Sequence, residues 1–209
     1  KKNPLYVTKR LGKNEKIFKM IKLRSMIENA DATGVFSSGN RDERITPIGK
    51  KIRKYKLDEF MQLCNVLLGD MSLVGPRPNV KEETDLYTIV EKKLLTVKPG
   101  ITDFSSIVFA DEGNILENED DPDLSYNQLI RPWKSRLGII YIENATIILD
   151  IKIIFYTLIG IVFRKKALNW ISNQLKLMNI NKEIIKISKR EESLYPFPPP
   201  GMDEIVKQR

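Results

Sequence analysis

The chain contains one cysteine, Cys64, and no histidine, and these two counts limit both how it can fold and what chemistry it can carry. A lone cysteine cannot form an intramolecular disulfide or a Cys-x-x-Cys metal site, so the sequence is typical of a reducing compartment. Without histidine there is no Ser-His-Asp triad, no imidazole general base and no imidazole zinc ligand. Catalysis would therefore depend on carboxylates, Lys, Arg, Ser, Thr, Tyr or a hard metal ion.

The composition allows a fold built on an apolar core. Of the 209 residues, 42% are apolar, which is enough for a sizeable core and argues against intrinsic disorder. We expect one main domain over residues 1–168, followed by a tail over residues 169–209 with one or two amphipathic helices. Near its end the tail carries PFPPPG at residues 196–201, a sequence typical of a polyproline-type strap.

The net charge of +8 is unevenly distributed. Residues 1–57 carry 16 basic and 5 acidic side chains, whereas residues 58–209 carry 19 and 22. Such a basic block suits anionic lipid headgroups, nucleic acid or phosphorylated small molecules, and charge alone does not choose among them. Residues 99–130 contain eight acidic and no basic side chains, which we interpret as a solvated acidic loop.

The hydrophobic pattern predicts an α+β fold that is mainly helical. Residues 5–10 and 16–23 are rich in β-branched and aromatic side chains and flank a short turn, which predicts an N-terminal β-hairpin. A helix is expected from Gly49 to Gly69, another over residues 80–95, and a rigid turn over residues 98–102. The apolar face expected on the first helix comprises Phe60, Leu63, Cys64, Leu67 and Leu68.

Residues 137–163 form the most apolar part of the chain. Polar residues recur there at helical spacing, which predicts an amphipathic helix that packs either on a soluble core or on a membrane surface. The longest charge-free apolar stretch, residues 153–163, is 11 residues long, well short of the roughly 20 that a spanning helix needs. The recurring polar residues are Glu143, Thr146, Asp150 and Thr157.

Asp58 and Glu59 form the candidate catalytic pair. An acidic pair near a helix start is by itself a capping feature far more often than a catalytic one. Two arginines change this interpretation: Arg53 lies five residues earlier, and Arg77 follows Pro76 in the rigid sequence GPRP. Arginine held in this way can bind a phosphate group through two parallel hydrogen bonds.

Lys22 and Arg24 add a third cationic element to this set. A carboxylate pair ringed by rigidly presented cations predicts a site for a phosphorylated substrate. A hard cation such as magnesium would bridge the phosphate oxygens and the carboxylates of Asp58 and Glu59.

Three stretches, in this order, also carry a resemblance. They are YVTKRLGKNEKIFKMIKLRSM at residues 6–26, RITPIGKKIRKYKLDEFMQLCNVLLGDMSLVGPRP at residues 44–78, and VKPGIT at residues 97–102. Over about residues 4–105 the chain resembles the bacterial sugar transferase family of monotopic phosphoglycosyl transferases. The segment around residues 141–158, with Asp150, is similar to the later membrane-surface helix of that family.

The resemblance implies a two-step reaction that initiates polysaccharide or glycoconjugate synthesis. Asp58 would attack a UDP-sugar, release the nucleoside monophosphate and hold a covalent phospho-sugar, which polyprenyl (undecaprenyl) phosphate then collects. Glu59 would support the metal or the aspartate, and Arg53 and Arg77 would hold phosphate oxygens. The absence of histidine fits this chemistry, because an aspartate with a pKa of about 4 is already ionised at pH 7.

Other features follow from the same resemblance. Lys98 and Gly100 would help to shape the nucleotide side of the pocket, and Asp103 stands where the commonest family pattern has glycine. Residues 1–168 would form the catalytic domain. The membrane-inserting helix of the family would precede residue 1 and is absent from this sequence, so the chain would be either a fragment or a membrane-detached relative. The partners would be a UDP-sugar, polyprenyl phosphate and the membrane surface, with a homo-oligomer allowed, at the cytoplasmic face of the bacterial inner membrane.

Two rival hypotheses come from other classes of protein. A basic nucleic-acid-binding module would use the charge of residues 1–57, but that block has few aromatic residues and no recognised RNA or DNA motif, so we expect no nucleic-acid partner. A catalytically silent scaffold of the same fold would keep the core and lose turnover. The presence of Asp58, Glu59, Arg53 and Arg77 argues against the silent scaffold.

Overall fold

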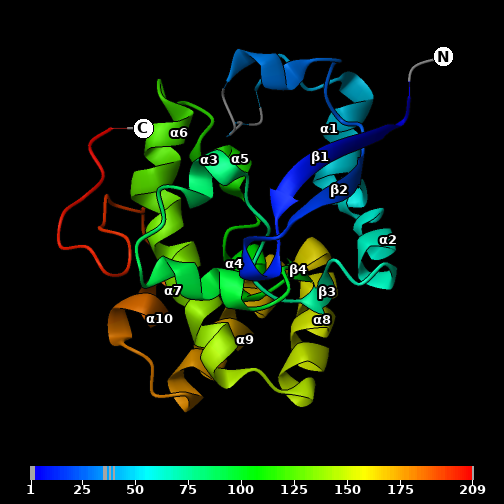
Figure 1. Cartoon of the computed structure of the whole chain (residues 1–209). Helices are drawn as coiled ribbons and strands as arrows, with labels where there is room; N and C mark the ends of the chain where they lie inside the picture. Colours follow the sequence, from blue (N-terminus) through cyan, green and yellow to red (C-terminus); the bar gives the residue numbers. More distant parts are fainter. Residues whose placement is uncertain (1–2, 35–36, 38, 40, 209) are drawn as a thin grey trace.

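A computed structural model of the chain describes residues 3–34, 37, 39 and 41–208. It is an α+β fold dominated by helices, as the sequence predicts, with an antiparallel hairpin and a second, parallel pair of strands (Figure 1). The strands are β1 (Leu5–Leu11), β2 (Ile17–Leu23), β3 (Ser72–Val74) and β4 (Gly100–Thr102). The α-helices are α1 (Pro47–Lys54), α2 (Gln62–Leu67), α3 (Lys81–Thr84), α4 (Phe104–Val108), α5 (Glu112–Ile115), α6 (Pro122–Ser125), α7 (Arg131–Asn144), α8 (Ile147–Val162), α9 (Arg164–Leu177) and α10 (Lys182–Lys189).

The predicted hairpin is confirmed, with Leu5 paired to Leu23 and Leu11 to Ile17. Alternate residues of β2 face inward, where Phe18 and Met20 pack against Met71. The Asn65 side chain of α2 joins the helix to this strand, since its amide donates to the Lys19 carbonyl (2.7 Å) and its oxygen accepts from the Ile21 amide (3.0 Å). The hairpin is thereby held against α2.

The continuous helix expected from Gly49 to Gly69 is wrong. The chain forms α1, then a 3₁₀ turn η3 (Leu57–Glu59), then α2, with a break at Lys56, whose φ of 55° is left-handed. Residues 50–56 carry mainly basic side chains and no apolar face to bury, so packing does not hold this part in one straight helix. Gly69 does end α2, as predicted, with a φ of 82°.

The rigid turn expected at residues 98–102 is instead partly a strand. Gly100–Thr102 forms β4, which pairs in parallel with β3. The two strands meet closely, because a Cβ atom added to Gly100 would lie 2.1 Å from the Gly75 nitrogen. Glycine is therefore required at position 100, where the backbone lies against Gly75.

Two further expectations also need correction. The helix expected over residues 80–95 is interrupted, because only α3 and a 3₁₀ segment η4 (Glu91–Thr96) are helical. The region 99–130 is not a solvated acidic loop, because Asp103 and Asp123 are buried and Asp111 forms ion pairs with Arg164 and Arg190. Short helices α4 to α6 form in this region, and Glu112 of α5 forms an ion pair with Lys134 of α7.

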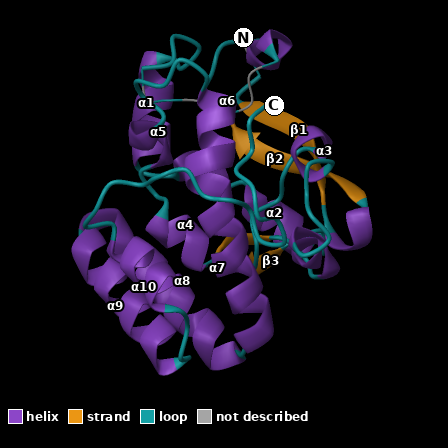
Figure 2. Cartoon of the chain, turned by 90° about the vertical axis from the view of Figure 1, so that its left-hand side faces the viewer, coloured by secondary structure: helices purple, strands orange, loops and turns teal. Residues whose placement is uncertain are grey.

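The main core lies between α4, α7, α8 and α9 (Figure 2). Its largest fully buried side chains include Phe104, Trp133, Ile153 and Ile171. The apolar segment 137–163 supplies two helices rather than one, since the chain leaves the helix at Ala145 and Thr146 caps α8. Part of this segment therefore belongs to the core, and the outer face of α8 does not.

The expected tail is helical and then irregular. Helix α9 begins at Arg164 and crosses the boundary expected at residue 168, burying Leu168 and Ile171 in the main core. After α10 the proline-rich strap, which we define as residues 194–206, lies along α7. The ring of Phe197 stacks on Trp133 with 4.3 Å between centroids.

Candidate active site

The predicted catalytic pair lies in η3, where the chain turns from α1 into α2. The left-handed backbone at Lys56 ends the first helical run and allows Asp58 and Glu59 to begin the next one. Next to this turn lies β2, which carries Lys22. The β3–β4 pair is also near, and Arg77 lies in the sequence between these two strands. Segments far apart in the sequence therefore meet at the carboxylates.

Glu59 and Arg77 form the best-defined interaction of the site. The guanidinium of Arg77 donates from Nη1 to Glu59 Oε2 (2.8 Å) and from Nη2 to Glu59 Oε1, and Nη1 also donates to the Ile101 carbonyl (2.6 Å). Burial alone raises the pKa of Glu59, but Arg77 and Lys22 outweigh it and lower the pKa to about 2. Glu59 is therefore ionised at neutral pH and holds Arg77 in a fixed orientation.

Asp58 has a different environment. Burial raises the pKa of this half-buried carboxyl, with Glu59 adding to the effect and Lys22 and Arg53 opposing it. Asp58 forms no ion pair with another residue in the part of the chain that the structure describes. Its carboxylate is the member of the pair that is left for a ligand or a substrate.

The structure brings together most of the predicted cations, but not all of them. Lys22 and Arg53 act on Asp58 through space, as predicted. Arg24 is used elsewhere, because its guanidinium donates to the carbonyls of Asn3 (2.9 Å) and Leu5 (3.0 Å) and lies over the Tyr6 ring. These contacts anchor the start of β1, and the predicted role of Arg24 in phosphate binding stays a prediction.

Pro76, Lys98 and Gly100 have mainly structural surroundings. Pro76 is buried, and its carbonyl accepts from the Gly100 amide (2.9 Å). Lys98 is exposed near Gly69. The predicted roles of Lys98 and Gly100 at the nucleotide side of the pocket, and of Pro76 in phosphate or substrate binding, stay predictions.

Two site residues were not predicted from the sequence. Lys56 is half-buried, and Asp103 caps α4 by accepting from the Ser106 amide (2.7 Å) while also interacting with Arg77. The position of Lys56, two residues before Asp58, was a signal that could have found it. A cavity of about 30 Å³ adjoins Arg77 and Asp103 and is lined further by polar side chains that include Asn79, Tyr87, Tyr126 and Lys134.

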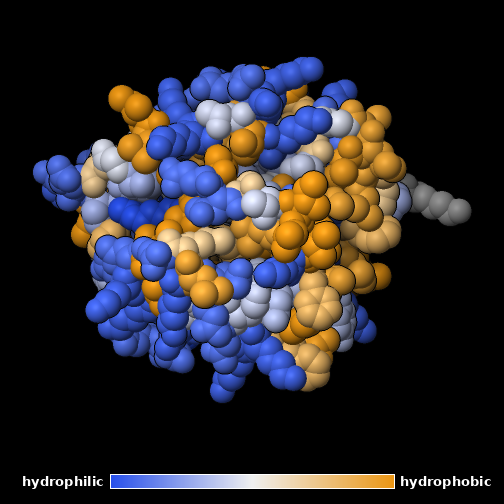
Figure 3. Space-filling model, turned by 90° about the horizontal axis from the view of Figure 1, so that it is seen from below, coloured by the Kyte–Doolittle hydropathy of each residue, from blue (hydrophilic) through white to orange (hydrophobic). Residues whose placement is uncertain are grey.

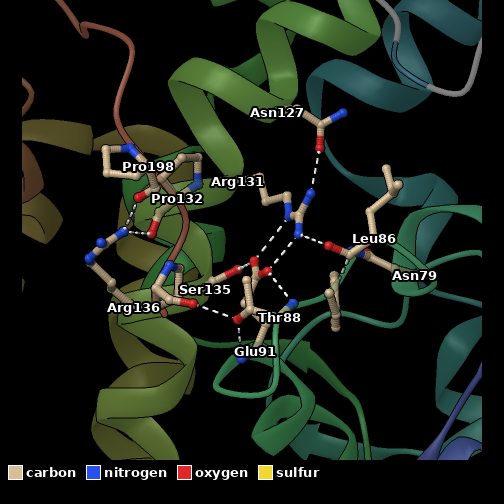
Figure 4. A network of polar contacts seen from close by, with 12 residues as sticks. Asn79, Leu86, Thr88, Glu91, Asn127, Arg131, Pro132, Ser135, Arg136 and Pro198 are labelled. Carbon is tan, nitrogen blue, oxygen red and sulfur yellow. Dashed lines mark hydrogen bonds and ion pairs between the residues drawn. The ribbon is translucent and has the colours of Figure 1, made fainter. Parts of the chain in front are cut away.

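Two residues that line this cavity, Arg131 and Ser135, belong to a buried network of polar contacts around Glu91 (Figure 4). Arg131 donates to both carboxylate oxygens of Glu91 (2.9 and 2.5 Å), and Ser135 donates to one of them (2.7 Å). Arg131 also donates to Asn127 (3.0 Å) and to the Leu86 carbonyl (2.5 Å). The network fixes η4 against α7 and so fixes the wall of the cavity.

An exposed apolar face adjoins the site. On α2 the polar residues Gln62 and Asn65 are buried, whereas Leu67 is 88% and Leu68 is 72% exposed. Figure 3 shows an extended apolar area on the side of the molecule where α2 and α8 lie in Figure 1. We call this surface the apolar face and define it as Leu57, Phe60, Leu67, Leu68, Ile147, Ile148, Ile151, Phe155, Leu158 and Val162.

Helix α8 is arranged in the same inverted way. Two of the four residues of the predicted polar stripe point inward: Asp150 accepts from the Tyr141 hydroxyl (2.7 Å), and Thr157 lies 2.6 Å from the Thr102 hydroxyl. The other two, Glu143 of α7 and the N-cap Thr146, are exposed. The outer side of α8 exposes Ile147, Ile148, Ile151, Phe155 and Leu158, whereas Leu149 and Ile153 are buried in the main core. Among the described residues, no helix is both long and apolar enough to cross a membrane.

Comparison with known proteins identifies the family. The model for the family "Bacterial sugar transferase" matches residues 1–164. The chain belongs to the bacterial sugar transferase family. This membership favours the transferase over the nucleic-acid-binding alternative.

Several curated proteins resemble this sugar transferase. Galactosyl transferase CpsE of Streptococcus agalactiae is 36% identical over 165 residues, which is 74% of this chain and 33% of CpsE. An Aeromonas hydrophila UDP-N-acetylgalactosamine-undecaprenyl-phosphate N-acetylgalactosaminephosphotransferase is 32% identical over 74% of this chain and 34% of its own length. The undecaprenyl-phosphate galactose phosphotransferase of Salmonella typhimurium is 33% identical over 73% of this chain and 32% of its own length. The chain thus spans about a third of the length of these relatives.

Proposed function

We propose that this sugar transferase moves a sugar 1-phosphate from a UDP-sugar to polyprenyl phosphate, with Asp58 as the nucleophile. The observation that carries the proposal is the division of the carboxylate pair: Glu59 is committed to Arg77, while Asp58 has no ion-pair partner among the described residues. The names of the Aeromonas and Salmonella relatives support the same reaction class, because each name includes the lipid undecaprenyl-phosphate and describes a sugar phosphotransferase.

The reaction has two displacement steps at one phosphorus atom. In the first, an Asp58 oxygen bonds to the β-phosphorus of the UDP-sugar, the bond from that phosphorus to the bridging oxygen breaks, and UMP leaves. In the second, a phosphate oxygen of polyprenyl phosphate bonds to the same phosphorus and releases the Asp58 carboxylate. Both nucleophiles are oxyanions, so neither step needs a histidine base.

Cations must offset the repulsion between these anions. Lys22 is the cation that acts most strongly on Asp58, with Arg53 also acting on it, and Arg77 is paired with Glu59. Because Glu59 and Arg77 neutralise one another, Arg77 can orient a phosphate oxygen without adding a large net charge. Glu59 is then a positioning residue for Arg77 rather than the nucleophile.

We also propose magnesium as a cofactor, held with the donor phosphates. The described residues contain no cluster of three or more Asp, Glu or Cys side chains that could bind a metal ion without substrate. Magnesium commonly uses one or two carboxylates together with substrate phosphates and water, and Asp58 provides one such carboxylate. Glu59 fits less well as a ligand, because both of its oxygens accept hydrogen bonds from Arg77. When bound, the ion would supply positive charge to the phosphate oxygens.

The apolar face would dock on the cytoplasmic surface of the bacterial inner membrane, where the acceptor phosphate lies. Leu57 and Phe60 flank the catalytic pair in sequence and are 49% and 65% exposed. An amphipathic surface of this kind binds at the boundary between headgroups and acyl chains. Docking there would bring Asp58 to the level of the lipid-linked phosphate.

Mass spectrometry tests the covalent step. We expect the chain in its membrane preparation, given magnesium and a panel of UDP-sugars without acceptor, to gain the mass of a phospho-sugar on the peptide that contains Asp58. Asp58→Asn should lose both the adduct and UMP release, because an amide is not a nucleophile. UMP release retained in Asp58→Asn would reject Asp58 as the nucleophile.

A further inference from the structure

Lys56 is a cation that the reaction described above does not use. It lies at the break between α1 and η3, and its side chain is half-buried rather than extended into solvent. Its ammonium donates one long hydrogen bond, to the Ser106 carbonyl (3.4 Å), and it forms no ion pair within the described ranges 3–34 and 41–208. An ammonium has three donors, so at least one well-placed acceptor is missing.

The backbone of Lys56 is also unfavourable for lysine. Its φ of 55° and ψ of 25° lie in the left-handed region, which glycine and asparagine tolerate better than residues with long side chains. Strained residues that persist are concentrated at functional sites. The left-handed backbone fixes where the side chain leaves the chain, and the ammonium keeps donors beyond its one long hydrogen bond to Ser106.

The position of Lys56 relates it to one part of the donor. Lys22 is the cation that acts most strongly on Asp58, whereas Lys56 interacts more with Glu59 and Arg77 than with Asp58. Its ammonium also reaches toward α4, whose first residues border the cavity beside Arg77. Lys56 is therefore associated with Glu59, Arg77 and the neighbouring cavity more than with the Asp58 carboxylate, so a donor phosphate that extends from Asp58 past Arg77 toward the cavity would meet its ammonium.

We propose that the Lys56 ammonium binds the phosphate of the nucleoside monophosphate half of the donor, the group that leaves when Asp58 is phosphorylated. This inference rests on the proposed function. Negative charge develops on that phosphate as its bond to the β-phosphorus breaks, so a cation there binds the donor and also favours the chemical step. The bond broken and the bond formed are those of the first displacement, and Lys56 transfers no atom.

The test separates a binding role from a structural one by using the left-handed backbone. We expect Lys56→Gly to weaken UMP binding, measured by calorimetry in the presence of magnesium chloride, by about tenfold or more, which is typical for losing a charge-assisted hydrogen bond. Lys56→Asn should weaken binding similarly, and Lys56→Arg should keep affinity within about threefold of the original. Lys54→Met, which removes an exposed charge two residues away, is the matched control and should leave UMP affinity unchanged.

Thermal melting is the second measurement. Lys56→Gly and Lys56→Asn should melt no more than about 3 °C below the unsubstituted chain, because both residues accept the left-handed backbone. UMP affinity retained in Lys56→Gly, or a larger loss of melting temperature in both variants, would overturn the assignment. Failure of the unsubstituted chain to release UMP from any UDP-sugar would instead count against the proposed function.

Discussion

Asp58 and Glu59 are neighbours in the sequence, yet their environments push their pKa values in opposite directions. Burial raises the pKa of Asp58, whereas Arg77 and Lys22 overcome burial at Glu59 and lower its pKa to about 2. Two carboxylates with separated pKa values are a common basis for separate roles. Here the separation assigns orientation of Arg77 to Glu59 and leaves Asp58 available for bond formation.

Arg77→Lys tests whether the shape of the arginine matters in addition to its charge. Arg77 donates to both Glu59 oxygens and to the Ile101 carbonyl, and a single ammonium cannot reproduce this planar arrangement. We expect UMP release to fall by about a hundredfold, measured with saturating UDP-sugar. Lys81→Arg, a substitution between the same two residue types at an exposed position, is the control and should leave UMP release unchanged. Full activity in Arg77→Lys would mean that only the charge is needed.

Glu83 provides a prediction about pH. Burial raises its pKa to about 7, with Arg10 opposing the effect and Glu112 adding to it. The pKa of Glu83 in the folded chain lies above the unfolded value of 4.5. The contribution of this carboxyl to the free energy of unfolding is therefore fully present below pH 4.5 and is lost as the pH rises through 7. Glu83→Gln should therefore stabilise the chain at pH 8 by up to about 3 kcal/mol and change little at pH 4.5.

Urea unfolding at the two pH values measures this difference. Glu82→Gln is the matched control. Glu82 is the exposed neighbour, so its substitution should change the free energy of unfolding little at either pH. An equal change in stability at pH 4.5 and pH 8 would show that the Glu83 carboxyl is not destabilised by ionisation.

At the scale of single elements, periodicity located the helices and hairpin better than it located their environments. The alternation in residues 5–23 predicted the hairpin, and Gly69 predicted the end of α2. The pattern of α2 also grouped Leu67 and Leu68 on one side correctly. It could not show that this side faces outward, because a 3.6-residue period is the same whether the apolar side meets a core or a lipid surface.

The sequence predicted that Asp58 and Glu59 lie near Arg77, but it did not predict that Arg77 pairs with Glu59. GPRP predicted a rigid Arg77, but which of two adjacent carboxylates it would hold depends on the crossing of β3 and β4, which no local pattern contains. Lys56 was missed because its left-handed backbone is set by the junction of α1 and η3. The partners of Arg24 at Asn3 and Leu5 were not predicted for the same reason, because they lie across the hairpin.

The exposed leucines of α2 are predicted to serve membrane binding rather than folding. Leu67→Ser/Leu68→Ser should lower binding to vesicles that contain anionic phospholipid by tenfold or more, since burying one leucine contributes about 1.5–3 kcal/mol. The free energy of unfolding should change by less than about 0.5 kcal/mol, because both side chains are exposed. Flotation with vesicles measures the first quantity and urea unfolding the second.

Ile89→Ser is the matched control, because Ile89 is 90% exposed but lies in the loop between α3 and η4, outside the apolar face. Undiminished flotation of the double variant would show that α2 does not contact the bilayer. Equal loss in the Ile89 variant would point to a general effect of surface hydrophobicity.

At the scale of the whole molecule, two helices turn their polar sides inward and their apolar sides outward. On α2, Asn65 bonds to the hairpin, and on α8, Asp150 and Thr157 bond to Tyr141 and Thr102. In water this arrangement would expose apolar area without compensation, so it is consistent with a nonpolar phase on that side. The N-terminal basic residues then supply charge that can meet anionic headgroups.

The strap lies on the side of the molecule away from the apolar face. It extends beyond residues 1–164, which match the family model. Phe197 stacks on Trp133, and Arg136 lies over the Phe197 ring (4.8 Å) while donating to the Pro198 carbonyl (2.9 Å). Further along, the Pro200 carbonyl accepts from the Thr88 hydroxyl (2.5 Å). Thr88 also donates its amide to Glu91, so the strap is connected to the buried ion pair that walls the cavity.

Phe197→Ala should therefore affect both stability and the site. We expect a loss of about 2 kcal/mol in the free energy of unfolding, because a half-buried aromatic ring and its stacking contact are removed. The Michaelis constant for UDP-sugar should rise, since loosening the strap frees Thr88 and, through it, Glu91. Ile205→Ala, at a strap residue that is 37% exposed, is the control and should change neither quantity appreciably. If Phe197→Ala lost stability but kept the Michaelis constant, the strap would be a clamp on α7 alone, without influence on the cavity.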